Sequence, residues 1–360
     1  MAGYKKKVFL ACSGVGHIQR GYESHILDLY NQLKNSNGID IFLIKGGGKS
    51  FGRIKRIYCI QRNSLFARII QKIFRKPVYM VEQISFFIMS IYFIFLERPK
   101  TIYSPDFTLL RLYVILKKLS GSKYKTILCN GGNYKPPYYG IEIVQFILPQ
   151  YADGIDFDNK VIIPHGFDCN KFIANKTKKQ YRNDLGLPVE KKIILSVGAI
   201  NCGVKRMDYL INEVAALTDT NLFLLIIGQK DEESKEIEKM ATRKLGRNFE
   251  IRSVDYDTIQ DYYLACDIFC LASLHETFGK VLIEAAICKL PVLVHDFEVS
   301  RMVLCEYAHY GNFAIVGNLS KLIDDLMKHC FEYDLDAASS LAKERFSWDR
   351  LSKQYVQMLS

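Results

Sequence analysis

The segment 268–295 constrains the fold more than any other part of the chain. It begins with the apolar run IFCLASL, which is typical of a strand buried on both faces of a parallel sheet. After a short acidic turn, the apolar sequence KVLIEAAICKL predicts a buried helix, opened by Thr277, Phe278 and Gly279. A second apolar run, PVLV, follows directly. Strand, helix and strand in this order predict a parallel α/β domain.

Two glutamates stand eight positions apart in this segment, Glu276 in the turn and Glu284 on the helix. Glu284 has mostly apolar neighbours, where an ionised carboxylate without a partner is costly, so a pair of ligand hydroxyls would suit it. The backbone N–H groups at the helix start favour a phosphate with a polar sugar beside it. A structural alternative is open, in which Glu276 caps the helix and Glu284 pairs with Lys205 or Lys280.

The same segment resembles the Glu-x7-Glu signature of the family 4 retaining glycosyltransferases, including the Leu-Pro-Val-Leu strand that follows it. The resemblance implies that Glu276 binds the hydroxyls of the donor sugar during catalysis and that Glu284 binds the nucleotide ribose. It also implies that Thr277, Phe278 and Gly279 take part in donor binding.

A lysine in the sequence SVGAINCGVKRMDYLI extends this resemblance. Lys205 lies seven residues after Gly198, like the family's lysine that neutralises the donor diphosphate during catalysis. Ala199 stands where arginine is frequent, and Lys289 where glycine is usual. Arg206 is the residue expected to supply the missing phosphate contact, while a solvated charge at a helix start is the alternative for Lys205. The resemblance further implies retention of anomeric configuration without a metal ion.

The first half of the chain opens with a strand, helix and strand pattern at 7–12, 22–33 and 39–44. Gly14 and Gly16 do not complete a nicotinamide-binding fingerprint, because Gln19 replaces the third glycine and Lys45 the acidic residue. The loop GVGHIQRGYE instead resembles the glycine-rich first loop of the same transferase family. This resemblance implies that Gly14 and Gly16 approach the donor phosphates or the acceptor.

Candidates for the acceptor side come from three loops. His17 and Arg20 can reach a ligand from the glycine-rich loop, although a histidine in a loop is as often solvated. Asp106, in Ser-Pro-Asp, stands where the family often has a histidine that contacts the donor sugar, and it is the third candidate for catalysis. Asn130 and Asn133, in CNGGNY, are further candidates, but such residues also occur in turns for backbone reasons.

The predicted fold class is α/β with GT-B architecture, in which two Rossmann-like doubly wound domains face each other across a cleft. The 360 residues, 49% of them hydrophobic, are enough for two cores. We expect an N-terminal acceptor-side domain at 1–170, a polar hinge at 171–192 and a nucleotide-sugar-binding domain at 193–345. Residues 346–360 resemble the family's terminal helix, which crosses back to the first domain, with Trp348 as its packing anchor.

The formal net charge of +11 predicts attraction to an acidic partner. Residues 53–76 contain eight Lys or Arg and no acidic residue, and apolar residues recur there at helical spacing. A peripheral membrane contact through 53–76 and an ordinary helix with a core face are both open, whereas no nucleic-acid motif occurs there. The apolar run at 84–96 has thirteen residues, too few to cross a bilayer, and predicts a buried helix.

The ten cysteines show no CxxC and lie mainly in apolar surroundings, which predicts reduced thiols. The basic start of the sequence is followed by too short an apolar run for a secretory signal. We therefore expect a cytoplasmic protein, either free or at the inner face of a membrane.

Taken with the resemblance, these features predict a retaining glycosyltransferase of the hexosyltransferase type. It would move a sugar from a nucleotide-diphosphate sugar, a UDP- or GDP-sugar, to a hydroxyl of a glycan or lipid-linked acceptor. No cofactor and no metal site are expected. Two alternatives stay open: a nucleotide-sugar epimerase of the same fold, and a non-catalytic subunit that binds the nucleotide sugar or a membrane.

Overall fold

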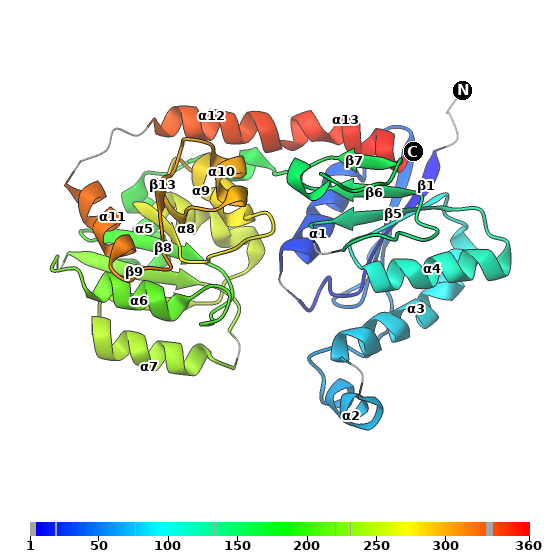
Figure 1. Ribbon diagram of the computed structural model, residues 1–360, viewed down its shortest axis with the longest axis horizontal. Coiled ribbons are helices and arrows are strands. Elements are labelled where there is room, and N and C mark those ends of the chain that lie inside the picture. Colours follow the sequence, from blue (N-terminus) through cyan, green and yellow to red (C-terminus); the bar gives the residue numbers. More distant parts are fainter. Residues whose placement is uncertain are drawn as a thin grey trace. The chain divides into compact units, whose positions relative to one another are not determined.

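The computed structural model describes residues 5–18, 20–75, 77–132, 134–219, 221–230, 232–328 and 334–360 of the chain. The chain divides into two compact units (Figure 1). Unit 1 comprises Met1–Phe167 and Trp348–Ser360, and unit 2 comprises Asp168–Ser347.

Unit 1 is built on a seven-stranded sheet in the order β3-β2-β1-β4-β5-β6-β7, in which every neighbouring pair is parallel. Its central strands are apolar and fully buried along most of their length, as expected for a sheet covered on both faces. The strands are β1 Lys6–Cys12, β2 Ile39–Lys45, β3 Ile54–Arg56, β4 Thr101–Ser104, β5 Lys125–Asn130, β6 Ile143–Phe146 and β7 Lys160–Ile162. The helices are α1 Gly21–Leu33, α2 Leu65–Phe74, α3 Val78–Glu97, α4 Phe107–Ser120, the short 3-10 turn Pro149–Tyr151 and α13 Trp348–Leu359.

Unit 2 has a six-stranded parallel sheet in the order β10-β9-β8-β11-β12-β13, the order of a doubly wound dinucleotide-type fold. The strands are β8 Lys192–Val197, β9 Leu222–Ile227, β10 Phe249–Arg252, β11 Ile268–Leu271, β12 Val292–His295 and β13 His309–Gly311. The helices are α5 Lys178–Leu185, α6 Met207–Ala215, α7 Ser234–Leu245, α8 Ile259–Ala265, α9 Lys280–Ile287, α10 Glu298–Leu304, α11 Asn318–Met327 and α12 Leu335–Phe346. Two 3-10 turns, Cys169–Phe172 and Tyr256–Thr258, complete the unit. In both sheets the strand ends that precede the helices meet at one edge, where ligand sites of such folds lie.

The segment 171–192, expected to be a hinge, is part of unit 2. It contains α5, which begins with a capping box between Thr177 and Gln180 and ends at Gly186 in the left-handed conformation. Arg182 of this helix is buried and donates to Asp267 Oδ2 at 2.5 Å and to the carbonyl of Ala265 at 2.8 Å. These contacts fix α5 to α8 and β11, so the segment is not a free linker.

The start of α9 also differs from the expectation. Thr277, Phe278 and Gly279 do not open the helix; they form the turn before it, and the helix begins at Lys280. Gly279 is the N-cap, with φ +71, a conformation that favours glycine. Just after the helix, Lys289 has φ +58, so it occupies a left-handed position of the kind that glycine usually takes.

Helix α3 contradicts the prediction of a thirteen-residue buried helix. It runs for 20 residues from Val78 to Glu97, and only 33% of its most apolar window is buried. By length and composition alone it is the one helix, among the residues the structure describes, that could cross a membrane. The prediction failed because the helix is apolar on nearly all sides, a pattern that in a soluble protein indicates burial.

Helix α13 packs into unit 1 through Trp348, the anchor named from the sequence. Its ring lies 6.2 Å from the His25 ring and nearly parallel to it, and its backbone N–H donates to Phe167 O at 3.1 Å. Gly166 leaves room for the indole, because a Cβ there would collide with it. Further along α13, the buried Tyr355 hydroxyl donates to Pro164 O at 2.9 Å. The helix is therefore an integral part of unit 1.

Candidate functional site

Lys205 and Glu276, two of the three catalytic candidates, meet in unit 2. The Lys205 ammonium donates to the Glu276 carboxylate, and both side chains are largely shielded from solvent. The lysine stem lies across Gly198 at the end of β8, where a Cβ would come within 2.8 Å of Lys205 Cε. Asn201 holds the loop by accepting the Lys205 backbone N–H at 3.0 Å. The glycine and lysine spacing seen in the sequence thus places the ammonium beside the turn that precedes α9.

Glu284 is on α9 and is 3% exposed. Its Oε2 accepts a hydrogen bond from the Tyr263 hydroxyl at 2.9 Å. Tyr263 is fully buried on α8 and was not singled out from the sequence. A buried carboxylate that a neighbouring hydroxyl orients is suited to bind further hydroxyl donors.

The turn between Glu276 and α9 presents backbone more than side chains. Phe278 is buried, and its ring packs edge-on against Phe346 at 5.7 Å between centroids. Thr277 is exposed, and Gly279 carries no side chain. Donor contacts from Phe278 and Gly279 would therefore come from the N–H groups at the start of α9.

Arg206 is engaged with the framework of unit 2. Its guanidinium donates to Phe313 O at 2.7 Å and to Ala272 O at 3.4 Å, and it stacks over the Tyr209 ring at 4.2 Å. Its side chain links the end of β11 to the segment after β13. The phosphate contact expected of Arg206 would require the guanidinium to leave these carbonyls.

In unit 1, polar groups from two loops contact the buried carboxylate of Glu82: Ser13 and His17 from the loop after β1, and Arg62 from the loop before α2. The carboxylate accepts hydrogen bonds from Ser13 Oγ at 2.6 Å and from Arg62 Nη2 at 2.6 Å, and His17 Nε2 lies 3.1 Å from it. Burial alone would raise the pKa of Glu82, but the hydrogen bonds from His17, Arg62 and Ser13 hold that pKa well below its usual range. Glu82 is therefore an ionised hub that fixes the glycine-rich loop.

Asp106 lies next to this hub, at the N-cap of α4. The Tyr79 hydroxyl donates to its Oδ1, whereas Oδ2 is buried without a hydrogen-bond partner among the described residues. Burial raises the pKa of Asp106 to about 6, with repulsion from Glu23 adding to it and the Tyr79 hydrogen bond opposing it. Burial likewise raises the pKa of Glu23. A carboxylate that is costly to ionise and half-satisfied is a candidate for ligand binding.

The glycine-rich loop is shaped by close backbone contacts. A Cβ at Gly14 would collide with the Glu23 carboxylate, and one at Gly16, where φ is +94, would come within 2.5 Å of the Gly47 carbonyl carbon. The loop thus brings His17 to Glu82, and His17 Nδ1 is buried without a hydrogen-bond partner in the described part of the chain. Arg20, by contrast, is exposed at the start of α1.

The side chain of Asn130 forms hydrogen bonds within its own loop. Its amide donates to Tyr134 O at 2.7 Å and accepts the N–H groups of Gly132 at 2.9 Å and Tyr134 at 3.2 Å. All of these contacts are with backbone groups of the turn, which is the structural role that asparagine often has in turns. Asn133, the other candidate in this loop, lies outside the described residues.

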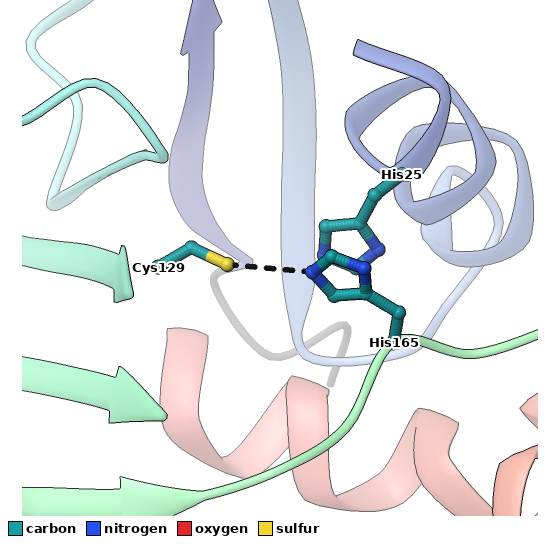
Figure 2. A group of neighbouring side chains, drawn as sticks. All are labelled: His25, Cys129 and His165. Atoms are coloured by element: carbon teal, nitrogen blue, oxygen red, sulfur yellow. Dashed lines mark hydrogen bonds between the residues drawn. The ribbon is translucent and has the colours of Figure 1, made fainter. Parts of the chain in front are cut away.

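A buried group of His25, Cys129 and His165 has ligand atoms within 4.8 Å of one another, close enough for a metal ion (Figure 2). The two imidazole rings are stacked, with centroids 3.7 Å apart and planes 10° apart. Ring nitrogens coordinate a metal in the plane of the ring, so one ion cannot lie in both of these parallel planes. Burial also raises the pKa of the Cys129 thiol to about 12, which disfavours the thiolate. These side chains fit a packed core beneath α13 better than a metal site.

Several residues that support the two sites were not predicted from the sequence. Tyr79, Glu82 and Arg62 hold the unit 1 cluster, and Tyr263 orients Glu284. Glu82 carried a signal, because it is the only charged residue in the mainly apolar stretch 78–96. Its partner Ser13 is 69 residues away, and no local pattern indicates that pairing.

Comparison with known proteins places unit 2 in a family. Residues 177–334 match the family described as glycosyl transferases group 1. An uncharacterized glycosyltransferase of Methanocaldococcus jannaschii, MJ1607, is 24% identical over 205 residues, which are 55% of this chain and 51% of that protein. The D-inositol 3-phosphate glycosyltransferase of Xylanimonas cellulosilytica is 25% identical over 211 residues, 54% of this chain and 50% of the relative. The chain thus spans about half the length of these curated relatives.

The fold extends over the whole chain. The solved structure of Anabaena HepE in complex with UDP-glucose has a TM-score of 0.76 at 15% identity, and the match covers 99% of each chain. The prediction of two parallel α/β domains with GT-B architecture is confirmed by this likeness and by the two sheets. Residues 177–334 thus match the group 1 glycosyltransferases, and the whole chain has a GT-B fold.

Proposed function

We propose that the protein transfers a sugar from a nucleoside-diphosphate sugar to a hydroxyl group of a glycan or lipid-linked acceptor, with retention of anomeric configuration. The observation that carries this proposal is the contact between Lys205 and Glu276 at the turn before α9, with Glu284 buried on the same helix. A cation and the start of a helix suit the diphosphate of such a donor. The carboxylates of Glu276 and Glu284 suit the hydroxyls of its sugar and of its ribose.

The chemistry follows from these charges. Departure of a nucleoside diphosphate develops negative charge on the leaving oxygen, and the Lys205 ammonium and the first N–H groups of α9 would stabilise it. Glu276 would then accept hydrogen bonds from the sugar hydroxyls, and Glu284 from the ribose hydroxyls. The Lys205 and Glu276 charges neutralise each other, which keeps both side chains in position.

Unit 1 would supply the acceptor side. Asp106 Oδ2 and His17 Nδ1 are buried polar atoms that lack hydrogen-bond partners in the described part of the chain. An acceptor hydroxyl can donate to the carboxylate, and a second hydroxyl can pair with the imidazole. The shared hub at Glu82 keeps this region rigid, because it binds the His17 loop to α3.

The test is release of nucleoside diphosphate from UDP-, GDP- and ADP-sugars, starting with UDP-glucose, in the presence of glycan and lipid acceptors. Lys205→Ala and Glu276→Ala are each expected to lose at least a hundredfold in kcat/KM. Lys239→Ala and Glu236→Ala are matched controls, because these residues form an exposed ion pair on α7. Donor binding without release, across all acceptors, would favour a non-catalytic subunit, and release unaffected by the Lys205 and Glu276 changes would refute the proposed site.

A further inference from the structure

Exposed apolar side chains are concentrated in one part of unit 1. Of the twenty large hydrophobic side chains that are exposed in the described part of the chain, fourteen lie between Phe51 and Leu119. Helix α2 packs on α3, and α3 packs on α4 (Figure 1). We define the apolar face by the ten exposed residues of α2 and α3: Leu65, Phe66, Ile69, Ile73, Ile84, Ile88, Met89, Tyr92, Phe95 and Leu96. Such a patch marks an interaction surface.

Helix α3 has two distinct sides. Glu82, Phe86, Ser90 and Ile94 recur every four residues and are buried in unit 1. Ile84, Ile88 and Tyr92 recur with the same spacing on the exposed side. The buried side is fixed by the hydrogen bonds of Glu82, so α3 cannot leave unit 1 to cross a bilayer without breaking them. The helix can therefore lie on a membrane surface, but it does not have the freedom to span one.

The surroundings of the apolar face are basic. No acidic residue occurs between Asp40 and Glu82, whereas ten Lys or Arg do. Among the described residues of this set, the exposed ones are Lys49, Arg53, Arg56, Arg68, Lys72 and Arg75. Two copies of the chain pressed together at this face would bring like charges into contact. An anionic phospholipid surface offers both the opposite charge and an apolar layer.

We propose that the apolar face docks on an anionic bilayer and that the opposite side of α3 presents the acceptor site to a lipid-borne acceptor. Tyr79 and Glu82, on this same helix, contact Asp106 and His17. A sugar acceptor carried on a lipid would thus reach the polar cluster from the membrane surface. The identity of the acceptor rests on the proposed function, whereas docking itself does not.

The test is co-flotation of the full chain with vesicles of phosphatidylcholine alone and of phosphatidylcholine with 30% phosphatidylglycerol, about a third of the lipid being anionic. Binding is expected to the anionic vesicles and to fall at high salt. Ile88→Asp with Phe95→Asp should weaken it at least tenfold. Ile315→Asp with Val316→Asp, at exposed apolar positions of unit 2, is the matched control and should leave binding unchanged.

A charge-reversal pair tests the basic contribution separately. Arg68→Glu with Lys72→Glu should weaken binding by roughly tenfold or more, since each basic residue near an anionic surface contributes about fivefold. Lys235→Glu with Lys239→Glu changes two exposed lysines at the same spacing on α7 and should have no such effect.

Two results would overturn the inference. One is a wild-type protein that stays unbound to anionic vesicles; the other is a dimer in solution that the Ile88 and Phe95 changes dissociate while vesicle binding is absent. Flotation needs neither donor nor turnover. A protein that floats but releases no nucleoside diphosphate would therefore refute the proposed function and still support the docking surface.

Discussion

Asp106→Asn should stabilise unit 1 at neutral pH, and the gain should depend on pH in a defined way. A carboxyl whose pKa rises from 3.8 to about 6 on folding disfavours the folded state when it ionises. Between these values the folded protein keeps a proton that the unfolded chain has released, so the free energy of unfolding falls as the pH rises. The penalty amounts to ~1 kcal/mol at pH 4.5 and ~3 kcal/mol at pH 8.

The asparagine variant cannot ionise and keeps an oxygen that can accept from Tyr79. Its stability relative to wild type should therefore rise by ~2 kcal/mol between pH 4.5 and pH 8. The two proteins must be compared at each pH, because the ionisation of Glu82 changes the free energy of unfolding in the opposite direction to that of Asp106. The pKa of Glu82 is lowered in the folded state, so its contribution is present at neutral pH and is lost in acid.

The assay is urea unfolding followed by tryptophan fluorescence. Trp348 is the only tryptophan in the sequence, and it is buried in unit 1 together with Asp106. Asp153→Asn is the control, because Asp153 is an exposed carboxylate of the same unit that stays in water in both states. A stability difference between Asp106→Asn and wild type that changes by less than ~0.5 kcal/mol over this pH range would refute the reasoning.

Two further predictions concern unit 2 and follow from the donor roles proposed above. Gly198→Ala should lower kcat/KM at least tenfold, because the new methyl would meet the Lys205 stem at 2.8 Å; Gly203→Ala, where a Cβ meets nothing within 4 Å, should not. Tyr263→Phe should raise the KM for the donor about tenfold (~1.4 kcal/mol), because it removes a hydrogen bond to the Glu284 carboxylate. Tyr262→Phe is its control, and equal KM values for the two tyrosine variants would contradict a role for the Glu284 contact.

The sequence predicted the strands well because parallel strands buried on both faces are continuous apolar runs. The runs around Val8, Leu195 and Phe269 all became central strands. The Lys205 and Glu276 contact follows for a different reason: each residue lies in the loop that follows a strand, and these strands, β8 and β11, are neighbours in the sheet. Local pattern and parallel topology together determine that pairing.

Other contacts depend on distant parts of the chain. Arg206 reaches the carbonyl of Phe313, 107 residues away, so its place in the framework has no sequence signal. The hub at Glu82 likewise joins Ser13 and His17, from the loop after β1, to Arg62, from a loop far away in the sequence. The hydropathy of α3 correctly predicted a helix but wrongly predicted that protein buries it on all sides. Composition does not distinguish an apolar surface that protein covers from one that lipid can cover.

Helix α3 connects the proposed docking surface to the polar cluster of unit 1. Glu82 can remain ionised in the interior only while Arg62, His17 and Ser13 surround it, so the position of α3 sets the position of the glycine-rich loop. Tyr79, one turn earlier, does the same for Asp106. Helix α3 is therefore hydrogen-bonded to two loops that carry acceptor-side candidates. A soluble enzyme gains nothing from exposing that face, whereas an enzyme that takes its acceptor from a membrane gains both an anchor and an oriented site.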